Sequence, residues 1–250
     1  MKRLDFIKAL AISGLSIPLL PYFQNVSNVD KIDEKALKRL MGIETDHLVA
    51  FEDTFLEEKT LSAFRSLKKA ASKDGIDIKI VSGFRSFQRQ KEIVESKLDF
   101  WKKKGYSTLE AYQKITVFSS IPGTSRHHWG TDIDLIDNSP TLPEGDLLIQ
   151  KNYAKNGAFY NFSQWMQENA ADYGFYLTYP EDENRSGFAF EPWHFSYRDA
   201  SLKNLKSIDF EALQSELTKR NIKGFNELPN DFLPKYLKDY MYGINPMLMP

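Results

Sequence analysis

Residues 122–135 read PGTSRHHWGTDIDL, which places two histidines and two aspartates within the eight positions from His127 to Asp134. A second short motif, EPWH, occupies residues 191–194. Catalytic zinc sites use three protein ligands drawn from His and carboxylate side chains and leave one position for water. The helical HExxH motif of many zinc proteases is absent from the sequence. We therefore expect a metal site assembled from loops and strand ends.

The composition of the 250-residue chain narrows the chemistry further. Apolar residues make up 42% and charged residues 27%, and 33 Lys plus Arg balance 34 Asp plus Glu to a formal charge of −1. That balance, without a basic stripe, argues against nucleic-acid binding, which depends on neutralising phosphates. The sequence has no cysteine, which excludes disulfides, thiol nucleophiles and Cys-ligated metals. Imidazole chemistry is confined to His47, His127, His128 and His194.

The first 28 residues have the pattern of an export signal. Lys2, Arg3 and Lys8 flank an apolar run over residues 9–20, which is shorter than the roughly 20 residues that span a bilayer. The segment KRLDFIK, residues 2–8, resembles a twin-arginine signal, but Leu4 stands where a second arginine is expected, so the export route stays open. An amphipathic first helix is the alternative. We predict a signal peptide over residues 1–28 and no stable membrane span after its cleavage.

Hydrophobic periodicity predicts helices and strands around the two motifs. Helices are expected over residues 30–40, after a capping box of Thr54 and Glu57, from Ser86 to Gly105, before Gly174, and after Asp209. Strands are expected over residues 76–81, 131–136, 175–178 and 188–197.

Two turn-rich segments and the tail complete the organisation of the chain. Residues 105–122 and 138–160 are rich in polar and turn-forming residues, and we expect them to be long loops or insertions around a site. The tail over residues 229–250 is expected to pack on the domain as a strap.

Two of the motifs occur in the order of a known zinc-peptidase pattern, S-x-H-x-x-G-x-A-x-D followed by E-x-W-H. The matching positions are Ser125, His127, Gly130, Asp134, Glu191, Trp193 and His194. The chain thus resembles the zinc D-alanyl-D-alanine carboxypeptidases and dipeptidases of the VanY and VanX type, over roughly residues 50–200. The upstream SGFRS, residues 82–86, together with Gln90, is similar to the substrate-binding segment of that family.

The resemblance implies roles for individual residues. It implies one zinc ion held by His127, Asp134 and His194, with Glu191 as the general base that deprotonates the zinc-bound water. A general base contributes roughly 10²–10⁴ in rate. Arg85 would bind the free C-terminal carboxylate of the substrate through a charge-assisted pair, which would make the enzyme an exopeptidase.

Two features of the sequence do not fit these roles directly. Asp132 stands where the pattern has a small residue, and on a strand it shares a face with Asp134. Asp132 could replace Asp134 as the metal ligand, could orient His127 or His128 by a hydrogen bond on the side away from the metal, or could cap a turn. We predict that Asp134 is the ligand. Glu191 and His194, three residues apart, would face opposite ways on a regular strand, unless Pro192 bends the chain.

The remaining candidates each have a structural alternative. His128 either orients a ligand or substrate or packs beside Trp129. Ser125 either binds substrate or shapes the turn, and Gln90 is the weakest substrate-binding candidate. Trp193 is most simply an aromatic of the core or of the pocket wall.

The resemblance implies an α+β fold of the hedgehog/DD-peptidase-like kind, in which helices flank a small antiparallel sheet and the zinc site lies in a groove on that sheet. We predict a signal peptide over residues 1–28, a single zinc peptidase domain over residues 29–200, and a helical C-terminal extension over residues 201–250 packed on the domain.

The predicted function is removal of the terminal D-alanine from peptidoglycan stem peptides by an exported bacterial enzyme of the periplasm or cell envelope. One group of alternatives keeps the chemistry, as a D-Ala-D-Ala dipeptidase or a peptidoglycan endopeptidase. Another is a catalytically idle zinc-bearing binding module, because hedgehog signalling domains resemble the same superfamily. Glu191 favours the enzyme, since a binding module needs no base.

Overall fold

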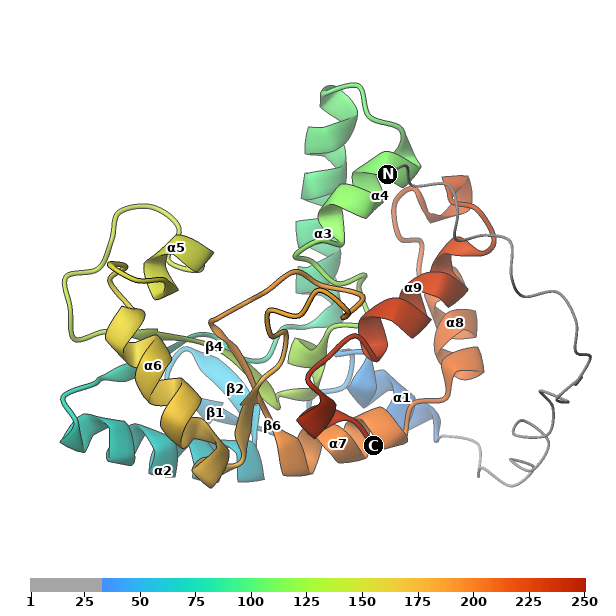
Figure 1. Ribbon diagram of the computed structural model, residues 1–250. Coiled ribbons are helices and arrows are strands. Elements are labelled where there is room, and N and C mark those ends of the chain that lie inside the picture. Colours follow the sequence, from blue (N-terminus) through green and yellow to red (C-terminus); the bar gives the residue numbers. More distant parts are fainter. Residues whose placement is uncertain (1–32) are drawn as a thin grey trace, which may run out of the picture. The chain divides into compact units, whose positions relative to one another are not determined.

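The computed structural model describes residues 33–250, so the predicted signal peptide and the expected helix start near Asp30 lie outside the described residues. The α-helices are α1 (Glu34–Leu40), α2 (Glu58–Lys73), α3 (Phe87–Lys103), α4 (Thr108–Ile115), α5 (Gln150–Tyr153), α6 (Tyr160–Asn169), α7 (Arg198–Lys206), α8 (Phe210–Thr218) and α9 (Phe232–Met241). The strands are β1 (Leu48–Phe51), β2 (Thr54–Glu57), β3 (Ile78–Ser82), β4 (Asp132–Asp137), β5 (Phe175–Leu177) and β6 (His194–Tyr197) (Figure 1). Within this part of the chain, no helix combines the length and the apolar character needed to cross a membrane.

The central sheet is antiparallel, with its four strands in the order β3-β4-β6-β5, and β1 and β2 form a separate hairpin. In the pairing of β4 with β6, Asp132 lies opposite Ser196 and Asp134 lies opposite His194. Because side chains alternate between the two faces of a strand, these four polar residues share one face. The small antiparallel sheet flanked by helices confirms the predicted α+β class.

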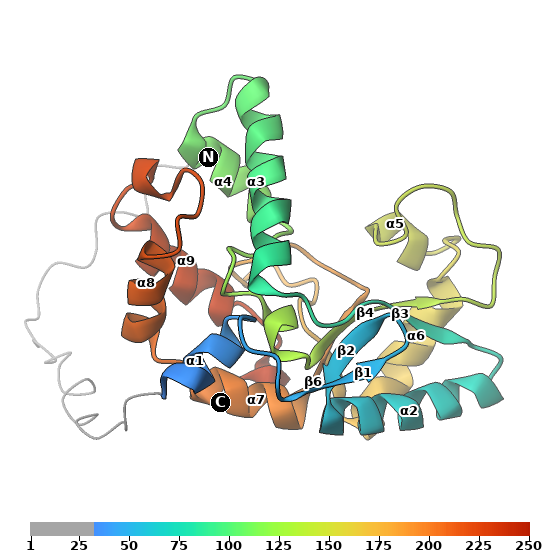
Figure 2. The ribbon, with the colours of Figure 1, turned by 180° about the vertical axis from the view of Figure 1, so that it is seen from behind.

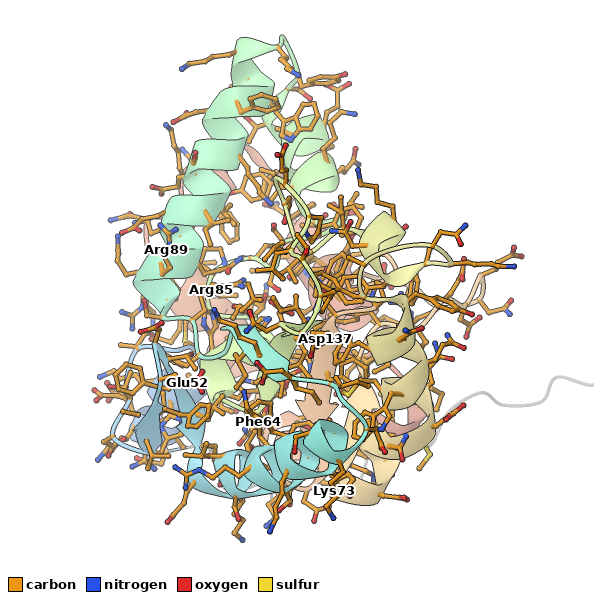
Figure 3. All side chains as sticks on the ribbon, turned by 90° about the vertical axis from the view of Figure 1, so that its left-hand side faces the viewer. Glu52, Phe64, Lys73, Arg85, Arg89 and Asp137 are labelled. Atoms are coloured by element: carbon orange, nitrogen blue, oxygen red, sulfur yellow. The ribbon has the colours of Figure 1, made fainter. Side chains whose placement is uncertain are left out.

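The opposite face of the sheet is apolar and packs on two helices. Ile133, Leu135 and Phe195 are buried there together with Phe64 of α2 and Phe162 of α6. Figure 3 shows Phe64 on the side of α2 that faces the strands. Each fully buried side chain of this size contributes roughly 1.5–3 kcal/mol. This core fixes β4 and β6, and therefore the polar face that they share.

A second apolar cluster joins the C-terminal helices to α3 and α4. It includes Leu98 of α3, Tyr112 of α4, Leu217 of α8 and Leu237 of α9. Figure 2 shows α8 and α9 beside α3 and α4. The C-terminal helices α8 and α9 thus pack against α3 and α4.

The predicted capping box of Thr54 and Glu57 is wrong. These residues form β2, which pairs with β1, and its alternation leaves Phe55 exposed and Leu56 buried. The side chain of Glu57 itself caps α2, because its carboxylate accepts a hydrogen bond from the Thr60 amide at 2.8 Å. Pairing in the hairpin therefore overrides the local helical signal.

The predicted loop over residues 105–122 is also wrong in part, because it contains α4. Ser107 and Glu110 form a capping box, and Ala111, Tyr112 and Ile115 make a buried stripe. The segment over residues 138–160 is largely irregular, as expected, with the short α5 near its end. The strand expected over residues 188–197 begins only at His194.

Candidate metal and peptide site

Three side chains meet on the polar face of the sheet. Asp134 comes from β4, His194 from the first position of β6, and His127 from a 3₁₀ turn over Arg126–Trp129. One candidate ligand atom from each lies within 4.8 Å of the others, and all three residues are buried. His127 Nε2 lies 3.3 Å from Asp134 Oδ2, and His194 Nδ1 lies 3.5 Å from Asp134 Oδ1. The predicted ligand set is therefore brought together.

Hydrogen bonds fix which nitrogen of each imidazole faces the cluster. His127 donates from Nδ1 to the Gly83 carbonyl at 2.8 Å, which leaves the Nε2 lone pair toward Asp134. His194 Nε2 lies 3.1 Å from Asp132 Oδ1, which leaves Nδ1 on the side of Asp134. Carboxylates and backbone carbonyls behind a histidine are the usual means of orienting a metal-binding imidazole.

Asp132 is fully buried and is engaged by protein donors at both oxygens. Arg126 Nε donates to Oδ1 at 2.8 Å, while Thr131 and Ser196 donate to Oδ2 at 2.8 and 2.9 Å. Burial alone would raise the pKa of Asp132, but the Arg126 guanidinium and the contact with His194 hold it below its usual value. By contrast, no residue of the described chain donates a hydrogen bond to Asp134 Oδ1. The geometry favours Asp134 over Asp132 as the ligand.

Replacement of Asp132 by alanine is expected to destabilise the protein by about 3–5 kcal/mol, because it leaves the buried Arg126 guanidinium without its carboxylate. Urea unfolding curves of the metal-free protein measure this loss directly. Asp199→Ala is a matched control, since the Asp199 side chain is 70% exposed, and a change within about 0.5 kcal/mol is expected for it. A loss of less than about 1 kcal/mol in Asp132→Ala would contradict the structural importance of this pair.

Glu191 lies in a turn rather than on a strand. The His194 amide donates to the Glu191 carbonyl at 3.1 Å, and this turn brings Glu191 Oε2 to 3.1 Å from His194 Nδ1. Burial raises the pKa of the Glu191 carboxyl, and the contact with His194 opposes that rise. The turn through Pro192 thus resolves the difficulty that residues three apart on a strand face opposite ways.

Arg85 lies where β3 gives way to α3, at the foot of that helix (Figure 3). Its guanidinium donates to Gln90 Oε1 at 3.0 Å and to Ser82 Oγ at 2.9 Å, and it lies 3.9 Å from Asp134 Oδ2. Gln90 is fully buried, and its amide nitrogen donates to the Ser120 carbonyl. Gln90 therefore lies behind Arg85 and orients it.

His128 joins the two loops that carry Arg85 and His127. The Gly123 amide donates to its Nε2 at 2.9 Å, so Nδ1 carries the proton and donates to the Arg85 carbonyl at 2.5 Å. Burial lowers the pKa of His128 to about 3, and the imidazole is neutral. These two hydrogen bonds place His128 behind the cavity, between the backbone at Gly123 and the backbone at Arg85.

A cavity of about 580 Å³ opens over the cluster. Ser125 and Trp193, the last two sequence candidates, line it together with Arg85, Glu191 and the three clustered residues. Trp193 also packs on Tyr153 in the apolar core, with ring centroids 5.8 Å apart. The cavity therefore contains the sequence candidates except the buried supports Asp132, His128 and Gln90.

Two residues near the site were missed from the sequence. Arg126 lies between Ser125 and His127, but nothing in the motif reveals that it pairs with Asp132. Lys97 lines the cavity from α3 but is itself exposed, and the sequence pattern did not distinguish it from a surface lysine.

The small antiparallel sheet and the buried His–Asp–His cluster, with a carboxylate beside it, define the class: an α+β protein with a candidate mononuclear metal centre in a cavity. Residues 53–200 match the VanY family, described as D-alanyl-D-alanine carboxypeptidase. The chain belongs to the VanY family.

Curated relatives span a range of lengths. A D-alanyl-D-alanine carboxypeptidase of Enterococcus faecalis (strain ATCC 700802 / V583) is 30% identical over 134 residues, which cover 53% of this chain and 44% of the relative. The bifunctional D-Ala-D-Ala dipeptidase and D-Ala-D-Ala carboxypeptidase VanXYC of Enterococcus gallinarum is 33% identical over 159 residues, which cover 62% of this chain and 75% of the relative. The chain thus spans less than half the length of the E. faecalis relative.

The solved structure of the LD-carboxypeptidase LdcB is 24% identical to the chain, with a TM-score of 0.49 and coverage of 80% of this chain and 81% of that one.

Proposed function

We propose that the chain is a zinc-dependent carboxypeptidase that removes the terminal D-alanine from peptidoglycan stem peptides. The observation that carries the proposal is the buried Glu191 carboxylate, 3.1 Å from His194 Nδ1 and in one cavity with the three clustered residues and Arg85. A binding module has no use for a base in this position. Membership of the VanY family supports the choice of substrate.

The donor set fits zinc. His127, Asp134 and His194 offer two imidazole nitrogens and a carboxylate oxygen, which are ligands of catalytic zinc. Asp134 Oδ1 is buried without a hydrogen-bond donor in the described chain, and a cation would satisfy it. When bound, zinc supplies Lewis-acid polarisation of a peptide carbonyl and lowers the pKa of water to about 7.

The residues of the chain itself supply binding and proton transfer. Arg85 holds the C-terminal carboxylate of the peptide, and Gln90 and Ser82 fix the direction of its guanidinium. The Glu191 carboxylate takes a proton from the water that attacks the peptide carbonyl and gives it to the nitrogen of the amine that leaves. Burial favours this proton uptake because it raises the pKa of Glu191. Trp193 closes one wall of the cavity.

The substrate sets the location of the proposed enzyme. Stem peptides belong to the cell wall, so the proposal includes export directed by residues 1–28 to the periplasm or cell envelope. The domain that acts there would begin near residue 29, with the catalytic part ending near residue 200.

Mass spectrometry of pentapeptide muropeptides tests the proposed function. Incubation with the purified protein and zinc is expected to remove one alanine, and a chelator is expected to stop the reaction until zinc is restored. Release of the D-Ala-D-Ala dipeptide from the muropeptides would indicate an endopeptidase, and hydrolysis of free D-Ala-D-Ala alone would indicate a dipeptidase. No product despite one bound zinc per chain would contradict the enzyme and favour the binding module.

A further inference from the structure

Lys97 of α3 lines the cavity and, within the described residues, makes no direct ion pair. Its ammonium group donates to Ser119 Oγ at 2.6 Å, and no carboxylate of residues 33–250 lies within 4.0 Å of it. Other lysines of the same helix are paired: Lys91 lies 3.9 Å from Glu95, and Lys102 lies 3.3 Å from Glu227. Lys97 differs from these two lysines because its partner is a hydroxyl group inside the cavity.

The surroundings of Lys97 include both a second cation and carboxylates. Burial and the nearby Arg85 guanidinium lower the pKa of Lys97, and the more distant carboxylates of Glu191 and Asp146 oppose that change. Lys97 and Arg85 line the same cavity, so two cations face the space that the substrate would fill. An ammonium group beside a second cation is stabilised by a carboxylate at hydrogen-bond distance.

The spacing of the two cations sets the distance between two anions. The Arg85 guanidinium donates to the Gln90 side chain, and Lys97 lies seven residues further along α3, which corresponds to about 10 Å along the helix axis. An extended peptide advances about 3.3–3.6 Å per residue, so the second anion belongs about two to four residues before the C-terminal one.

We propose that Lys97, supported by Ser119, binds a second carboxylate of the peptide substrate, upstream of the scissile bond and separate from the C-terminal carboxylate at Arg85. The inference rests on the proposed carboxypeptidase function and specifies its substrates as acidic stem peptides. The exposed Phe118 beside Ser119 provides an apolar contact for the intervening peptide.

Two synthetic pentapeptides ending in D-Ala-D-Ala test this. They differ only in the third residue, which has a free side-chain carboxylate in one and its amide in the other. The wild-type protein is expected to cleave the acidic peptide with about tenfold higher kcat/KM. Lys97→Met is expected to remove that preference by slowing only the acidic peptide, while Lys103→Met, an exposed lysine on the same helix, is expected to change neither.

The outcomes separate this inference from the proposed function. Cleavage of both peptides without a preference, or an equal loss on both in Lys97→Met, would overturn the role of Lys97 and leave the carboxypeptidase intact. If neither peptide is cleaved, the proposed function fails, and calorimetric binding of both peptides to the metal-free protein still tests the inference. Tighter binding of the acidic peptide that is lost in Lys97→Met supports it, and equal or absent binding overturns it.

Discussion

Glu191→Gln is expected to retain one bound metal ion per chain and to lower kcat by about 10²–10⁴. Glutamine has nearly the same shape as glutamate and keeps a hydrogen-bonding group beside His194 Nδ1, where Glu191 Oε2 lies at 3.1 Å. It cannot take up a proton at neutral pH. Turnover of pentapeptide muropeptides, measured together with the metal content of the same preparation, checks both halves of the prediction.

The same variant distinguishes a base from a fourth ligand. Glu191 lies close enough to the cluster that its carboxylate could contact a metal, and in that case Glu191→Gln would lose metal along with activity. Glu191→Asp provides a matched comparison, since it keeps the carboxylate but withdraws it by one methylene, and an intermediate kcat is expected. Full activity of Glu191→Gln would contradict the mechanism.

Part of the polar face of the sheet was predictable from the sequence. The alternation Asp132, Ile133, Asp134, Leu135 indicates a strand with a polar and an apolar face, with Asp132 and Asp134 on the same face. The helix cap at Ser86 was also readable, because Ser86 Oγ accepts the Arg89 amide at the start of α3.

What the sequence could not provide is long-range pairing. The turn that brings Glu191 to His194 depends on the start of β6 at His194 rather than at residue 188, and β6 starts there because it pairs with β4. The pairing of Arg126 with Asp132 likewise depends on how the 3₁₀ turn folds over the sheet. The periodicity of hydrophobic residues along the chain predicts neither of these two contacts.

The failure at Thr54 has the same origin. Thr54 and Glu57 have the spacing of a capping box but form the ends of strand β2. Burial of Leu56 and pairing with β1 outweigh a local helix cap, which contributes about 1 kcal/mol. The α4 helix was missed for the opposite reason. Its signals, Ser107 with Glu110 and a buried stripe, are local, and the turn-forming residues around them concealed them.

His194→Ala is expected to abolish metal binding and, with it, all metal-dependent activity. The substitution removes one of three candidate ligands, and the remaining His127 and Asp134 leave too few protein donors for a catalytic zinc site. Metal content after dialysis against zinc, and the rise in melting temperature that zinc causes, measure the loss. Wild-type protein is expected to be stabilised by zinc, because a ligand that binds only the folded state raises stability, and His194→Ala is expected to show no such rise.

The fold of His194→Ala is expected to survive, which keeps the result interpretable. Asp132 loses one contact but keeps Arg126, Thr131 and Ser196 as donors, so its charge remains compensated. His47→Ala is the matched control, since His47 lies outside the cavity, and it is expected to bind one zinc ion and show the full rise in melting temperature. Asp134→Asn offers a second ligand variant with less change in volume. Zinc binding at wild-type stoichiometry in both His194→Ala and Asp134→Asn would overturn the proposed ligand set.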